Sequence, residues 1–92
     1  MKRARKTEQL EDMINIGPAM AGWLRQAGIH RPDDVRDLGA VECYLRISTV
    51  HRNAANRMAL YALYGAIHNE NCTWLAPDIK EMLEGMLQEA GK

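Results

Sequence analysis

The sequence predicts an all-α fold, a compact bundle of about five to six short helices. Apolar residues recur at helical spacing along most of the chain, and no stretch alternates apolar and polar residues over six or more positions. Gly and Pro residues stand at the boundaries between these segments. The chain has 92 residues, 47% apolar and 26% charged. This length suits one small domain and argues against a two-domain enzyme with a deep catalytic chamber.

We expect residues 1–7 to form a flexible basic tail and residues 8–92 to form a single helical domain. The formal net charge is zero, but the two ends of the chain differ. Residues 70–92 carry five acidic side chains and two lysines. Residues 1–6 carry no acidic side chain and four basic ones, Lys2, Arg3, Arg5 and Lys6. A run of this size usually serves solubility, so we interpret it as a solvated tail.

The first two helices are predicted on either side of a turn. A short helix is expected from about Thr7 to Met13, and Asn15-Ile16-Gly17-Pro18 then interrupts the apolar spacing. The second helix begins at Pro18, which suits a first helical position, and stops at Gly28, which suits a left-handed C-terminal cap. We expect a positive φ at Gly17, so that Gly17→Ala would cost about 1 kcal/mol or more.

The rest of the chain is predicted to hold four further helices. Their expected ranges, with the loops between them, are Pro32–Leu38 ended by Gly39, Ala40–Ile47, a loop at Ser48–Ala55, a central helix at Asn56–His68, a turn at Asn69–Thr73, and a last helix opened by Pro77. Met58 is among the apolar residues that nearly encircle the fifth helix, which is why we expect that helix to be central. Arg31, before the third helix, is a poor N-cap.

The two cysteines, Cys43 and Cys72, fit no CxxC spacing and no disulfide-dense pattern, so a reducing cytoplasmic location is expected. No apolar run approaches the 18 residues of a membrane span. The basic start of the chain leads into polar residues and not into the apolar stretch of a signal peptide. We therefore expect no membrane contact.

No constellation of residues points to catalysis, a metal or a cofactor. The four lysines lie outside the turn region, which argues against a Schiff-base lyase. His68 and Cys72 stand four residues apart, yet a turn is predicted between them and no second pair of ligands accompanies them. A Cys–His catalytic pair is equally unsupported. The expectation is a non-enzymatic protein without cofactor or small-molecule substrate.

Residues 8–28 have the layout of a helix-hairpin-helix element, which binds nucleic-acid phosphates through the backbone amides at the start of its second helix. The candidate contacts are Gly17, Ala19, Met20 and Arg25, with Lys2, Arg3, Arg5 and Lys6 of the tail. DNA-binding hairpins commonly carry a cation just after the proline, where this chain has Ala19-Met20. Since arginines and aspartates are interleaved nearby, we favour a hairpin that only connects two packed helices.

Over about residues 10–85 the sequence resembles the C-terminal domain of the TfoX (Sxy) family of bacterial competence regulators. The matching motifs are Asn15-Ile16-Gly17-Pro18, Ala21-Gly22-Trp23-Leu24, Ala27-Gly28-Ile29, Asp34-Val35, Leu38-Gly39-Ala40-Val41, Tyr44, Leu60-Tyr61-Ala62-Leu63, Gly65, and Trp74 with Pro77. The resemblance implies a compact helical domain with a helix-hairpin-helix-like core (SAM/HhH-like), found in proteins that control natural DNA uptake, and no enzyme activity. Full-length members carry a preceding domain; the start at Met1 favours a stand-alone relative over a fragment.

The leading hypothesis is an interaction module that acts in bacterial regulation through protein contacts, either with a partner or with itself. Aromatic residues at inner helical positions are assigned to the core and not to base stacking. The apolar stripe of the last helix could pack on its own domain or on a partner, and the candidate protein contacts are Trp74, Ile79, Met82, Leu83, Met86 and Leu87. The alternative hypothesis is a non-specific nucleic-acid-binding helix-hairpin-helix module.

Overall fold

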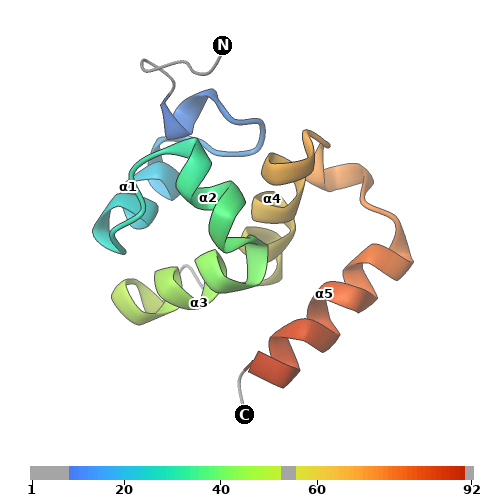
Figure 1. Ribbon diagram of the computed structural model, residues 1–92. Helices are drawn as coiled ribbons and strands as arrows, with labels where there is room; N and C mark the ends of the chain where they lie inside the picture. Colours follow the sequence, from blue (N-terminus) through green and yellow to red (C-terminus); the bar gives the residue numbers. More distant parts are fainter. Residues whose placement is uncertain (1–8, 53–55, 91–92) are drawn as a thin grey trace.

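The computed structural model describes residues 9–52 and 56–90, and this part of the chain forms an all-α bundle without strands (Figure 1). The predicted fold class is confirmed. The elements in chain order are the 3-10 turn η1 (Leu10–Asp12), α1 (Pro18–Gln26), α2 (Pro32–Leu38), α3 (Ala40–Val50), α4 (Arg57–His68), the 3-10 turn η3 (Cys72–Trp74) and α5 (Pro77–Ala90).

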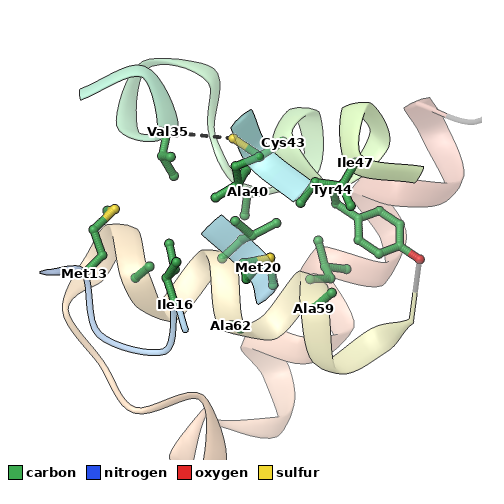
Figure 2. Close-up of a cluster of buried hydrophobic side chains, with 14 of the residues drawn as sticks. Met13, Ile16, Met20, Val35, Ala40, Cys43, Tyr44, Ile47, Ala59 and Ala62 are labelled. Atoms are coloured by element: carbon green, nitrogen blue, oxygen red, sulfur yellow. Dashed lines mark hydrogen bonds between the residues drawn. The ribbon is translucent and has the colours of Figure 1, made fainter. Parts of the chain in front are cut away.

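Helix α4 is the centre of the bundle, as predicted. The side chain of Asn56 caps its start by accepting a hydrogen bond of 3.0 Å from the amide of Ala59. Seven residues of α4 are buried: Ala59, Leu60, Tyr61, Ala62, Leu63, Gly65 and Ala66. Figure 2 shows side chains of α1, α2 and α3 converging on this helix, among them Met20, Val35 and Ile47. The prediction that counts Met58 among the packed apolar residues of this helix is wrong, because Met58 is 55% exposed.

The ends of α1 follow the predicted punctuation. Pro18 occupies the first helical position, and Gly28 takes a φ of +87° just after the last turn. The amide of Ile29 then donates a 2.8 Å hydrogen bond back to the carbonyl of Leu24. This cap folds the Ile29 side chain into the core, where it is fully buried. The C-terminal stop of α1 therefore also contributes apolar burial.

Helices α2 and α3 are joined by Gly39 alone, which has a φ of +87°. Arg31 gives α2 no side-chain cap, as expected, and the carboxylate of Asp34 accepts a 3.2 Å hydrogen bond from the Arg31 amide instead. Glycine tolerates the left-handed conformation that turns the chain between two helices without a loop. The buried Val35 and Ala40 thus face the same core from both sides of the turn.

Two boundaries differ from the prediction. Helix α3 extends to Val50, so the predicted loop at Ser48–Ala55 is wrong for its first three residues; residues 53–55 lie outside the described residues. The hydroxyls of Ser48 and Thr49 donate to carbonyls three residues back, each at 2.7 Å, so both side chains are satisfied within the helix.

In place of the predicted first helix, the described residues contain only the turn η1, and Thr7 lies outside them. The helix-hairpin-helix core remains a prediction.

Asn15 ties the segment before α1 to the end of α4. Its φ is +73°, and its side-chain amide donates a 2.7 Å hydrogen bond to the carbonyl of Glu70 and a 3.5 Å one to that of Ala62. Its side-chain oxygen accepts a 3.3 Å hydrogen bond from the amide of Cys72. One side chain therefore satisfies backbone groups of α4, of the chain leaving it, and of η3.

Gly65 makes this tie sterically feasible. A Cβ atom at this position would overlap the carbonyl oxygen of Glu70 and the side-chain nitrogen of Asn15. The Glu70 amide also donates a 2.7 Å hydrogen bond to the Gly65 carbonyl, so the chain must turn back directly against α4. Glycine is required here for close approach and not for an unusual φ.

We predict opposite effects for two helical glycines. Gly65→Ala should lower the free energy of unfolding by about 1–3 kcal/mol, because the new methyl group forces backbone and Asn15 apart. Gly22→Ala in α1 should raise it by about 0.5–1 kcal/mol, because nothing lies within 4 Å of its added Cβ and alanine has the better helix propensity. Thermal melts of both variants check this. An unchanged melting temperature for Gly65→Ala would contradict the tie.

Candidate functional site

The predicted hairpin turn has its strained residue at Asn15 and not at Gly17. Gly17 is the N-cap of α1 with a φ of −93° and a ψ of −176°, an extended conformation that any residue adopts. Nothing lies within 4 Å of a Cβ built on Gly17. The prediction that Gly17→Ala is costly is therefore wrong. The positive φ falls two residues earlier, on an asparagine whose side chain is held by three backbone groups.

The start of α1 is open to solvent, but no charged side chain stands there. Gly17, Pro18 and Ala19 are exposed, whereas Met20 is 8% exposed and its side chain belongs to the core (Figure 2). A phosphate at this point would meet amide groups of the first helical turn. Met20, a predicted phosphate contact, could therefore reach a phosphate only with its backbone amide, because its side chain is buried.

Arg25 is already engaged by an acid of the same domain. Its guanidinium makes a two-pronged ion pair with the carboxylate of Glu11, at 2.8 and 3.0 Å. This hydrogen bonding holds the pKa of Glu11 below its usual value and raises the pKa of Arg25. No spacing in the sequence signals this pair, because its members stand 14 residues apart in two elements. The remaining predicted cations, Lys2, Arg3, Arg5 and Lys6, lie outside the described residues.

A pocket of about 330 Å³ lies between α5 and the rest of the bundle. We call it the α5 pocket. It is lined by Met82, Leu83 and Met86 of α5, by Tyr64, Ile67 and His68 of α4, and by Arg36, Gly39, Ala40 and Val41 from the end of α2 and the start of α3. Three of these ten residues were predicted protein contacts. The other seven come from elements that sequence spacing cannot bring together.

The six predicted protein contacts fall into three groups. Leu83 is 2% exposed and anchors α5 to the bundle, while Ile79 and Leu87 are half-buried against the core. Met82 and Met86 are 43% and 48% exposed at the mouth of the α5 pocket. Trp74, in η3, is 80% exposed. One part of the apolar stripe, Ile79, Leu83 and Leu87, therefore packs on the bundle, whereas Met82 and Met86 remain exposed to solvent.

The titratable groups of the described residues give no sign of a catalytic or metal centre. Among these residues no group of three or more His, Cys, Asp or Glu side chains is placed to hold a metal ion. The Cys43 thiol is buried and donates to the Val35 carbonyl at 3.8 Å, and burial raises its pKa to about 12. A thiol with this pKa stays protonated at neutral pH and is a poor nucleophile. The described helices also include none long and apolar enough to cross a membrane.

We predict that the two thiols differ in reactivity. Iodoacetamide at pH 8 should modify the half-buried Cys72 and leave Cys43 unmodified in the folded protein, because Cys43 is inaccessible and protonated. Both should react in guanidinium chloride. Peptide mass spectrometry after digestion reads the two sites separately, and Cys72→Ser provides the single-thiol control. Equal labelling of both cysteines in the native chain would contradict the buried, protonated state of Cys43.

The comparisons with known proteins place this fold in a family. The chain is similar to an uncharacterized protein from Listeria monocytogenes solved in a triclinic crystal form, with a TM-score of 0.79, 30% identity, and coverage of 90% of this chain and 93% of that one. A protein of unknown function from the same organism, in a tetragonal form, gives a TM-score of 0.73 at 31% identity, covering 84% and 93%. No curated protein matches. The model of the TfoX C-terminal domain matches residues 6–87, and the chain therefore belongs to this family.

Proposed function

We propose that this domain is a non-enzymatic interaction module that serves bacterial regulation, in the control of DNA uptake, through protein contacts made at the α5 pocket. The observation that carries this proposal is the pocket itself, an apolar hollow of about 330 Å³ with the half-exposed Met82 and Met86 at its mouth. Large apolar side chains beside an apolar hollow are typical of protein contact sites. The TfoX C-terminal domain assignment supports the regulatory part of the proposal.

The chemistry of the pocket suits a protein ligand. Methionine side chains are flexible and polarisable, so they adapt to apolar groups of different shapes. Tyr64 and Ile67 of α4 and Val41 of α3 supply further apolar lining of the pocket. Because Tyr64, Ile67 and Val41 come from α3 and α4, which pack together in the core, this part of the lining is preformed, while the methionine side chains of α5 can adjust.

We predict that Met82→Glu and Met86→Glu weaken the contact by about tenfold or more, because each places a charge against the apolar ligand. The measurement is crosslinking or pull-down in the source cell, followed by identification of the protein lost from the variants. The matched control is Met58→Glu, a change at a more exposed methionine that does not line the pocket. If no partner is captured and oligomer size is the same in all variants, the proposed function is wrong.

A second candidate function, non-specific nucleic-acid binding, rests on the exposed start of α1. The exposure of Gly17, Pro18 and Ala19 leaves room for a phosphate beside the first helical amides. The ion pair between Arg25 and Glu11 weighs against it, since a neutralised guanidinium contributes little to phosphate attraction. If the basic residues of the first six positions supplied four phosphate contacts, log affinity would fall against log salt with a slope of about −3.6 on duplex DNA.

For this candidate we predict that Ala19→Lys leaves the melting temperature unchanged, because Ala19 is exposed in the first turn of α1. If the hairpin holds a phosphate, the added cation raises DNA affinity and makes the salt slope steeper by about 0.9. A fluorescence titration at two salt concentrations measures both quantities. Unimproved binding would mean that the turn before α1 only connects helices.

A further inference from the structure

The charges on α5 are divided between its two sides. On one side, Glu84 accepts a hydrogen bond of 2.5 Å from the Tyr61 hydroxyl and lies 3.6 Å from the Arg57 guanidinium. Lys80 lies over the same tyrosine ring, 5.4 Å from its centroid. These contacts balance the charge on the side of α5 that faces the start of α4.

The other side of α5, where the methionines lie, keeps two unbalanced carboxylates. At 100° per residue, Asp78 and Glu89 stand only about 40° and about 20° around the helix from Met82. Both are exposed, and neither forms an ion pair within the described part of the chain. They therefore form an acidic border beside the two methionines on the surface of α5, with one exposed carboxylate near each end of the helix.

The wall opposite α5 does not compensate for these acids. Its one cation, Arg36, pairs with Asp33 at 3.0 Å. The next residue, Asp37, is an exposed acid. The exposed charges at Asp37, Asp78 and Glu89 are thus all negative, while the pocket lining supplied by Val41 and Ile67 is apolar.

Building on the proposed function, we propose that the α5 pocket receives a basic amphipathic helix of a partner protein, whose apolar residues enter the pocket and whose Lys or Arg side chains face Asp78 and Glu89. A helix laid between helices presents anchors at i, i+3, i+4 and i+7, which suits a hollow lined by α3, α4 and α5. Complementary charge around an apolar contact fixes the partner's orientation and speeds association.

Two occupants from this chain itself fit less well. A second copy of α5 would bring its own Asp78 and Glu89 against the same acidic border, and like charges repel. Residues 1–6 carry the right sign of charge, but Met1 and Ala4 are their only apolar residues, which is too little to fill the pocket. The charge pattern thus favours a partner that combines both properties in one helix.

The test uses two labelled peptides of about 18 residues, long enough for about five helical turns. Both carry Leu at the i, i+3, i+4, i+7 positions; one has Lys at the remaining positions and the other has Glu. Fluorescence anisotropy with the full chain should show saturable binding of the Lys peptide only. Met82→Ser combined with Met86→Ser should weaken this binding about tenfold, with an unchanged thermal melt.

A matched pair of charge variants places the contact. Glu89→Gln should weaken binding of the Lys peptide about two- to fivefold at low salt and much less at high salt. Glu81→Gln removes the same charge from the same helix but lies about 100° from Met82 and about 140° from Met86, so binding should be unchanged. Equal effects of the two variants would mean diffuse attraction and would overturn the proposal.

Other outcomes separate this proposal from the proposed function. Equal binding of the Lys and Glu peptides, or binding of neither while crosslinking still depends on Met82 and Met86, overturns the basic helix and leaves a protein contact at the pocket. A dimer of the wild-type chain that disappears in the methionine variants identifies a second copy as the occupant and likewise overturns it. If no crosslink formed in the cell depends on Met82 and Met86, the proposed function is overturned, whatever the peptides do.

Discussion

The close approach of Asn15 to the last turn of α4 determines how the segment before α1 meets the segment that follows α4. Asn15 bonds to the carbonyl of Glu70 and to the amide of Cys72, 55 and 57 residues away in sequence, and the absent side chain of Gly65 leaves the space for it. These long-range hydrogen bonds hold the chain that enters α1 against the chain that leaves α4.

After this tie the chain has few anchors left, and that explains the form of the α5 pocket. Leu75 is buried, Pro77 opens α5, and Leu83 is the one residue of α5 that is buried in the described structure. Beside this leucine, α5 contacts the bundle through the half-buried Ile79 and Leu87 and through the hydrogen bond between Glu84 and Tyr61, and it runs along one side of the bundle (Figure 1). The apolar stripe of α5 is wider than the surface that covers it, so Met82 and Met86 remain exposed.

Much of the fold could be predicted because its signals are local. Pro18, Pro32 and Pro77 open helices, and Gly28 and Gly39 end them, as fixed or permissive φ values require. Failures occurred where a distant or side-chain partner decides the outcome. The predicted strain at Gly17 fell on Asn15 because that side chain finds partners across the chain, and α3 continued past Ile47 because two hydroxyls bond within the helix. The pairing of Arg25 with Glu11 follows no helical spacing, because the two residues lie in different elements.

Of the ten residues that line the α5 pocket, the sequence prediction named three, for the same reason. Periodicity identified the stripe on α5 but not its division into Leu83, which is buried and holds the helix, and the two methionines, which are half-exposed. The wall opposite α5 depends on the turn at Gly39, which brings the end of α2 and the start of α3 to the mouth of the pocket. No pattern within a single helix contains that information.

The residues that tie the start of α1 to the end of α4 are distinct from the exposed residues of α5 on its methionine side. Asn15 and Gly65 act through backbone groups and close contact, whereas Met82, Asp78 and Glu89 are exposed and carry no structural hydrogen bond within the described residues. Exposed positions tolerate substitution at little cost in stability. A domain arranged this way can keep its fold, as the similarity at 30% identity illustrates, while its contact surface changes. Specificity for a partner then depends on a few side chains of α5, whose pattern of charge and apolar groups can change independently of the bundle.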